Sequence, residues 1–182
     1  MRRLPALITT AIATLALTGC ATTLNVSSHV ERGVDFAQYR SYDWGPADAL
    51  PTGDPRLDRD PFFQDHLQGA VEKQLATKGL GWGTPGMADL LIHYHANISE
   101  RIDVDRMDID RGYCYADGCS PPVVAYEAGT LVLDIIDMRT NRLIWRGWAQ
   151  GSVKGMLDSQ DTMARQINEA VTRMFMAFPR PL

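Results

Sequence analysis

The feature that most constrains the fold is the segment GTLVLDIIDMRTNRLIWRGWAQG, residues 129–151, in which apolar and polar residues alternate on both sides of a short polar break. Alternation with a period of two residues is typical of a β-strand that buries one face. The break at residues 139–141 suits a tight turn in which Asn141 takes a left-handed conformation. The segment therefore predicts an antiparallel β-hairpin with one face in the core.

The expected register of this hairpin places Ile135 opposite Trp145 and Leu133 opposite Gly147 on the core face. The residues predicted to share that face are Leu131, Leu133, Ile135, Leu143 and Trp145. The pairs predicted on the other face are Asp134 with Arg146, Ile136 with Ile144, and Val132 with Trp148. A shift by one residue would mix the two faces, so the alternation favours this register.

Two amphipathic helices are predicted elsewhere in the chain. Asp60 and Pro61 suit the start of the first helix, as N-cap and first helical residue, and Gly79 suits its end. Asp158 or Ser159 caps the second helix, which Pro179 ends. The apolar stripes at helical spacing are Phe63, Leu67, Ala70, Val71 and Leu75 in the first, and Met163, Ile167, Ala170, Val171, Met174, Phe175 and Phe178 in the second.

Further strands are predicted by alternation in residues 23–30 and 88–105, the latter as one long strand or as a strand continued after a bulge at Glu100. The Pro- and Asp-rich residues 46–60 are predicted to form a loop. Two amphipathic helices cannot cover both faces of such a sheet. We therefore expect an α+β fold: a two-layer sandwich with a mostly antiparallel sheet and two helices packed on one face.

The first residues are typical of an export signal. Arg2 and Arg3 precede the apolar stretch 4–17, which is too short to span a bilayer, and Leu17-Thr18-Gly19-Cys20 resembles a bacterial lipobox. We expect residues 1–19 to be a cleaved lipoprotein signal peptide, residues 20–24 a lipidated N-terminus and tether, and residues 25–180 a single domain. The alternative is an ordinary secretory signal with a chance cysteine.

The charge of the chain bears on its partners. With 18 basic and 22 acidic residues the net charge is −4, which argues against nucleic acid and against electrostatic binding to anionic lipid. We expect acyl chains on Cys20, palmitate being one candidate, to supply the membrane anchor. By resemblance to enteric lipoproteins, the absence of Asp after Cys20 implies sorting to the outer membrane, facing the periplasm, with inner-membrane retention as the alternative.

The other two cysteines, Cys114 and Cys119, lie close together in YCYADGCS. In an oxidising compartment such a pair tends to close, and Asp117-Gly118 supplies turn chemistry, so a loop-stapling disulfide is the expectation. Free thiols and half of a metal site are the alternatives.

His93 and His95 lie two residues apart on a predicted strand and so point to one face, which we expect to be the helix-free face that also carries Asp134, Arg146 and Trp148. With a further ligand such as Asp134 they are weak candidates for a metal site; the alternative is an ordinary solvated sheet face. The acidic run Asp103, Asp105, Asp108 and Asp110 hints at calcium, but it lacks the EF-hand spacing and fits a wet acidic face better.

Trp148 and Arg146 share the predicted non-core face, a composition found in recognition surfaces. The alternative is cross-strand packing of Trp148 on Val132, with Arg146 paired to Asp134. No catalytic motif for a nucleophile, metalloprotease or phosphate-binding loop is present in the sequence, so we expect no enzyme activity and no cofactor, an envelope hydrolase being the alternative.

The chain resembles a family of proteobacterial envelope lipoproteins that carry a domain of unknown function. The lipobox, YRSYDW, QLATKGL, ADLLIHYH, the hairpin GTLVLDIIDMRTNRLIWRG and the final INEAVTRMFMAFP carry the resemblance, in that order. It implies an envelope lipoprotein of unassigned activity and carries over no catalytic residue. We expect a non-enzymatic binding or structural module with an envelope protein as partner. The alternative is a metal- or small-ligand-binding lipoprotein that uses the sheet face around His93 and His95.

Overall fold

The computed structural model describes residues 24–45, 54–103 and 124–179 of the chain. The elements in chain order are β1 (Asn25–Val30), η1 (Phe36–Gln38), β2 (Ser41–Trp44), α1 (Pro55–Asp58), α2 (Pro61–Thr77), β3 (Gly81–Trp82), β4 (Leu90–Asp103), β5 (Val124–Asp137), β6 (Arg142–Ser152) and α3 (Gln160–Phe175). The strands form one six-stranded sheet in the order β1-β6-β5-β4-β2-β3. All neighbouring strands are antiparallel except β2, which runs parallel to both β3 and β4.

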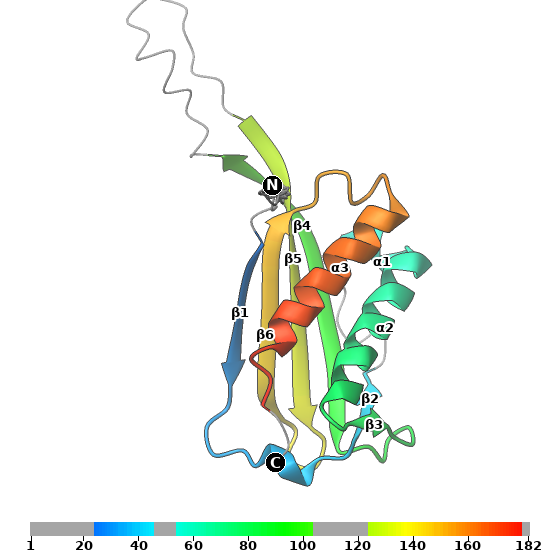
Figure 1. Cartoon of the computed structure of the whole chain (residues 1–182), viewed down its shortest axis with the longest axis vertical. Helices are drawn as coiled ribbons and strands as arrows, with labels where there is room; N and C mark the ends of the chain where they lie inside the picture. Colours follow the sequence, from blue (N-terminus) through cyan, green and yellow to red (C-terminus); the bar gives the residue numbers. More distant parts are fainter. Residues whose placement is uncertain (1–23, 46–53, 104–123, 180–182) are drawn as a thin grey trace, which may run out of the picture.

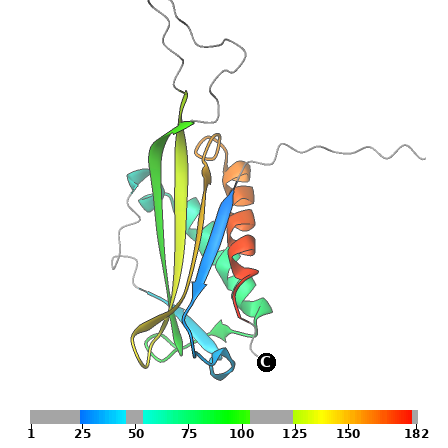
Figure 2. The same cartoon turned by 90° about the vertical axis from the view of Figure 1, so that its left-hand side faces the viewer.

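The long helices α2 and α3 pack side by side on one face of this sheet, as Figures 1 and 2 show. This arrangement confirms the predicted two-layer α+β sandwich. Among the described residues, no helix combines the length and apolar character that crossing a membrane requires.

Both long helices begin as their sequences predict. The Asp60 side chain accepts a hydrogen bond from the Phe62 N–H at the start of α2, and Ser159 accepts one from the Thr162 N–H at the start of α3. Gly79 follows α2 with a φ of 79°, a left-handed conformation that favours glycine. Every residue of the two predicted apolar stripes is buried, so these stripes form the core against the sheet.

The β5–β6 hairpin confirms most of the predicted register. Ile135 lies opposite Trp145, Leu133 opposite Gly147, and Asn141 takes a φ of 54° in the turn. Trp145 is fully buried between the sheet and α3, with its ring centroid 5.2 Å from that of Phe175.

The prediction was wrong at the end of the hairpin next to the turn. A bulge between Ile135 and Ile136 shifts the register, so that Ile136 pairs with Leu143 and not with Ile144. The extra residue reverses the faces beyond it, because successive side chains alternate. Ile144 is therefore buried, whereas Leu143, predicted in the core, lies on the other face and is 36% exposed.

Two short elements lie in segments for which no helix or strand was predicted. Helix α1 lies within the predicted loop 46–60, and β3 follows α2. Strand β4 pairs with β5 along its whole length without a bulge, so the single long strand is confirmed and the bulge at Glu100 is wrong. Since β6 pairs with β5 only as far as Ala128, the distal ends of β4 and β5 form a two-stranded arm (Figure 1).

Candidate functional site

The sheet face opposite α2 and α3, called here the helix-free face, carries a row of polar residues across neighbouring strands. His29 of β1 lies opposite Arg146 of β6, Arg146 opposite Asp134 of β5, and Asp134 opposite His93 of β4. The alternation in the sequence predicted that Asp134, Arg146 and His93 share a face. The strand order brings them into direct register.

Asp134 and Arg146 form the strongest interaction of this row. The Arg146 Nε and one Nη donate to the two carboxylate oxygens of Asp134, each at 2.6 Å. The Asp134 side chain is 8% exposed and that of Arg146 is 46% exposed. The hydrogen bonds from Arg146 to Asp134 raise the pKa of the guanidinium above its ordinary value. The pair therefore holds a fixed, charged donor group at the surface.

His93 lies at the other end of this ion pair and is half-buried. Desolvation lowers the pKa of its imidazole, the nearby His95 lowers it further, and Asp134 acts in the opposite direction. Gly45 follows β2 and lies against the His93 ring: a Cβ at position 45 would overlap the imidazole. The absence of a side chain at position 45 thus leaves room for the His93 ring.

A second row runs parallel to the first. His95 lies opposite Val132, Val132 opposite Trp148, and Trp148 opposite Ser27. Trp148 is 36% exposed, so the packing on Val132 leaves part of its ring open to solvent. The predicted grouping of His93, His95, Asp134, Arg146 and Trp148 on one face is present in the structure.

The metal interpretation lacks a further ligand within the described residues. No group of three or more His, Cys, Asp or Glu side chains that could hold a metal ion occurs there. Both Asp134 oxygens already accept hydrogen bonds from Arg146. His93 and His95 therefore stand as a pair of imidazoles on the strand, without the third ligand that the sequence analysis sought from Asp134.

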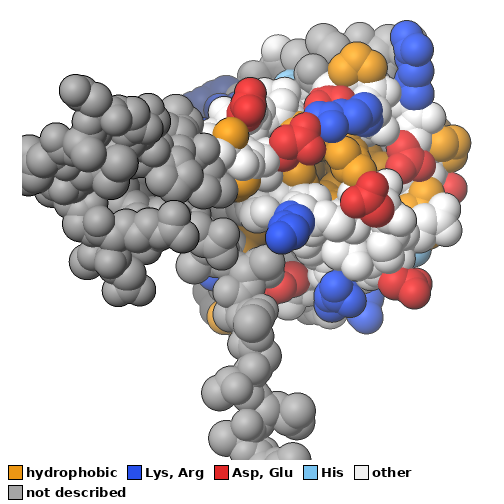
Figure 3. All heavy atoms as spheres, turned by 90° about the horizontal axis from the view of Figure 1, so that it is seen from above, with side chains coloured by type: hydrophobic (Ala, Val, Ile, Leu, Met, Phe, Trp, Pro, Cys, Tyr) orange, Lys and Arg blue, Asp and Glu red, His pale blue; other side chains and the backbone are white. Residues whose placement is uncertain are grey.

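An apolar pocket on the opposite side of the sheet was missed by the sequence analysis. It lies between the sheet and the helices, at the end where β1 begins, and has a volume of about 80 Å³. Ala96, Gly129, Ala149 and Gly151 leave space above the strands, and Phe63 and Ile167 come from the helices. Figure 3, seen from this end, shows hydrophobic side chains between acidic and basic ones.

The signal for this pocket was present in the sequence as four small residues at core-facing strand positions. Alternation assigns a residue to a face but does not say whether the helices above it fill the space. A hollow depends on the distance between the layers, which only the packed structure defines.

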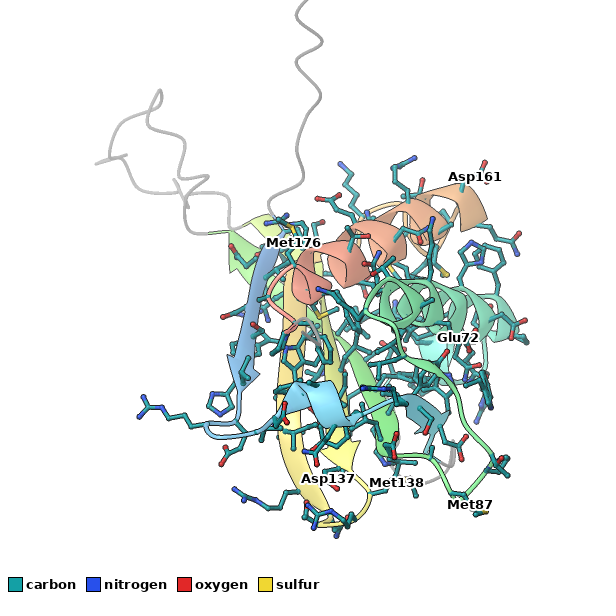
Figure 4. The ribbon with its side chains drawn as sticks, turned by 60° about the horizontal axis from the view of Figure 1, so that its bottom comes forward. Glu72, Met87, Asp137, Met138, Asp161 and Met176 are labelled. Atoms are coloured by element: carbon teal, nitrogen blue, oxygen red, sulfur yellow. The ribbon has the colours of Figure 1, made fainter. Side chains whose placement is uncertain are left out.

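At the other end of the sheet, Asp137 ties the hairpin turn to η1, as its place in Figure 4 illustrates. Its carboxylate accepts from the Tyr39 hydroxyl at 3.0 Å and from the N–H groups of Arg139 and Thr140 at 2.8 and 3.1 Å. Burial, followed by the hydrogen bond to Asp137, raises the pKa of Tyr39 to about 12. Burial acts to raise the pKa of Asp137, but the hydrogen bonds from Thr140, Tyr39 and Arg139 bring it below its ordinary value.

Several predicted sites lie outside the described residues. They are the lipidation site Cys20, the disulfide candidates Cys114 and Cys119, and the acidic residues Asp105, Asp108 and Asp110. The backbone of Asp103 ends strand β4, but its side chain also lies outside the described part of the chain.

The fold and the face together define a small α+β domain that combines a helix-covered core with a polar and aromatic open sheet face. The chain belongs to the family described as "Domain of unknown function (DUF4136)", whose model matches residues 26–180. No curated protein matches the chain.

Among solved structures, the chain is similar to the crystal structure of a PDZ domain protein from Parabacteroides distasonis, with 15% identity and a TM-score of 0.53. The match covers 87% of this chain but only 37% of that one, and it shows the fold alone. A PelC dodecamer from Paraburkholderia phytofirmans matches with 11% identity and a TM-score of 0.45, over 86% of this chain and 100% of that one. A second crystal form of that dodecamer gives 8% identity and a TM-score of 0.44, over 84% and 98%.

Proposed function

We propose that the protein is an outer-membrane lipoprotein, anchored through lipid on Cys20 and facing the periplasm, whose domain binds another envelope protein without catalysing a reaction. The observation that carries the proposal is the composition of the helix-free face. Exposed Trp148 lies beside the fixed guanidinium of Arg146, and aromatic residues with Arg are enriched at protein-binding surfaces.

The apolar content of this face supports the same function. A sheet face that only meets water carries mainly polar side chains, yet several residues here are apolar and in part accessible. These residues are Leu91, Val132, Ile136, Leu143 and Trp148. Together with Arg146, they suit a partner that presents an apolar group next to a carboxylate or a backbone carbonyl.

The non-enzymatic role is supported by the state of the charged groups on this face. Asp134 is engaged by Arg146 through both oxygens, which leaves it poorly placed to accept a substrate proton.

The binding role is tested by co-purification of the full-length chain from crosslinked envelopes. Trp148→Ala removes the exposed indole of the face, and Trp82→Ala is the matched control because Trp82 is also exposed, at 58%, on the edge strand β3. We expect a specific partner to be recovered with the wild type and with Trp82→Ala, and to be lost with Trp148→Ala. Equal recovery with both variants, or repeated recovery of the chain alone, contradicts the proposal.

The anchor is tested separately by mass spectrometry of the mature N-terminus and by membrane fractionation. We expect a chain that starts at lipid-modified Cys20 and sediments with the outer membrane, and we expect Cys20→Ala to release it. An unmodified Cys20, or a chain that starts elsewhere, refutes the anchor but leaves the binding face untouched.

The apolar pocket favours a second candidate function, the binding of the apolar part of a small molecule. Its lining is mainly apolar, and small residues form its floor. An environment-sensitive naphthylamine dye tests this role: we expect the wild type to enhance its fluorescence and Ala149→Leu, which fills the floor, to abolish the enhancement. Equal enhancement by both proteins rejects the pocket as a ligand site.

A further inference from the structure

The outer edge of β1 is a regular strand edge that no described strand covers. Within the described residues β1 pairs only with β6, and its six residue pairs run without a bulge. An uncovered strand edge presents a row of N–H and C=O groups to which another strand can pair. Proteins commonly block such edges with lysine, proline or a bulge, and β1, with the sequence NVSSHV, carries none of these.

The hydrogen bonds of the ladder define which groups of β1 are available. The Glu31 N–H donates to the Ile144 carbonyl at 2.9 Å, directly after the last pair of β1. Because partners alternate along an antiparallel strand, the odd-numbered residues of β1 bond to β6. The N–H and C=O groups of Val26, Ser28 and Val30 therefore point away from β6, toward the free edge.

The other end of the sheet differs. There the edge strand β3 has two residues and its neighbour β2 has four. Short edge strands give little length for pairing and are one of the ways in which proteins protect an edge. The contrast makes β1 the edge strand with the length to accept a partner.

We propose that β1 pairs with β1 of a second copy of this chain, antiparallel and with Ser28 opposite Ser28, to join the two sheets into one. This register places Val26 of each copy opposite Val30 of the other, on the face that carries the helices. On the helix-free face it places Asn25 opposite Glu31 and Ser27 opposite His29. The free groups of Val26, Ser28 and Val30 then all find partners.

In this register β1 is complementary to itself, which favours a second copy of this chain as the partner. Val26 and Val30 are only partly buried in one copy, although they pack against the core, and the pairing covers them with each other. The positions that face each other on the helix-free side are polar or singly charged, and no like charges meet.

Helix α3 is compatible with this pairing because it packs against β6 and β1 (Figure 2). Its exposed surface carries Glu169 and Arg173, which form an ion pair at 3.3 Å. Two copies of this surface related by a two-fold axis present equal numbers of opposite charges to each other. The inference does not depend on the lipid anchor or on the binding role of the helix-free face.

The experiment uses the full-length chain with Cys114 and Cys119 replaced by serine, in mild detergent, with disulfide crosslinking by a copper–phenanthroline oxidant. Directly opposed residues have Cα atoms about 5.5 Å apart, within reach of a disulfide, so Ser28→Cys is expected to give a covalent dimer on a non-reducing gel. Asn25→Cys on the same strand is the control. In the proposed register the two copies of residue 25 lie about 20 Å apart, six residues at about 3.4 Å each, so no dimer is expected.

A second variant tests the edge itself. Ser28→Pro removes an N–H that points to the free edge and makes no bond within one copy, so the domain should keep its melting transition while the dimer dissociates in light scattering. If Ser28→Pro fails to fold, the cysteine comparison stands on its own. Equal crosslinking of Ser28→Cys and Asn25→Cys, crosslinking of Ser28→Cys to a different protein only, or a monomeric wild type at 100 µM overturns the proposal.

Discussion

Removal of Arg146 should destabilise the protein through the carboxylate that it leaves behind. Arg146→Met keeps the length of the side chain but takes both hydrogen bonds from Asp134, whose side chain is only 8% exposed. Breaking a fully buried ion pair costs roughly 3–5 kcal/mol, and losing an exposed one costs roughly 0–1 kcal/mol. Since Arg146 is itself half exposed, and water can partly hydrate Asp134 once it is gone, we expect a loss of about 2 kcal/mol.

The assay is urea unfolding at pH 7, followed by tryptophan fluorescence, with two controls. Arg142→Met removes an ion pair of similar length, 2.7 Å to Glu31, but with both partners more exposed, and it should cost less than about 1 kcal/mol. The double variant Asp134→Val with Arg146→Met removes both charges and should recover most of the loss. If Arg146→Met costs no more than Arg142→Met, or if the double variant is as unstable as the sum of its parts, the reasoning fails.

Three further predictions follow from the described contacts. Gly45→Ala should lower the free energy of unfolding by about 1–3 kcal/mol, because the added Cβ overlaps the His93 ring. Most of this loss should vanish when His93→Ala is added. Chemical denaturation of the wild type, the two single variants and the double variant measures the effect. NMR titration of His93 should give a pKa below its ordinary value of 6.5. Because the fold favours the neutral ring, the stability that this residue contributes is complete above about pH 7 and is lost as the pH falls through the pKa of the folded state. His93→Gln should therefore lose less stability than the wild type on acidification from about pH 7 to 5. Because the pKa of Tyr39 is raised from 10.0 to about 12, the fold favours its protonated hydroxyl up to pH 10 and loses that contribution as the pH rises toward 12; Tyr39→Phe should therefore lose less stability than the wild type over that interval in thermal melts, and an identical loss would refute the role of this hydroxyl.

The register of the hairpin shows how far a sequence pattern reaches and where it stops. Alternation correctly paired Ile135 with Trp145, because one face of each strand must be apolar. It missed the bulge at Ile136, which lies next to a turn that the Asp137 carboxylate organises through the N–H groups of Arg139 and Thr140. Hydrogen bonds of this kind influence how many residues the turn contains, and the apolar–polar alternation of the two strands does not reveal them.

The helices were predictable for a different reason. The caps at Asp60 and Ser159 and the long apolar stripes are local signals that act over a single turn or a single face. Helix α1 and strand β3 are too short to show a period, so their formation depends on neighbours distant in the sequence.

For the candidate site, the alternation of residues along each strand predicted that His93 and Asp134 share a face, but it did not predict that they lie opposite each other. That neighbourhood follows from β4 lying next to β5, and strand order is set by the packing of the whole sheet. The contact between Gly45 and His93 arises in the same way, from the parallel pairing of β2 with β4.

The pairing of β1 with β6 also determines the order in which this chain can fold. It joins the first described strand to one that ends at Ser152, so the contact closes a loop of well over a hundred residues, whereas β5 and β6 meet across a short turn. Loop-closure entropy favours early formation of the local hairpin and late docking of β1. Until the ribosome has released nearly the entire polypeptide, the N-terminal strand has no partner. Completion of the sheet at this edge therefore waits for the synthesis of β6, more than a hundred residues after β1.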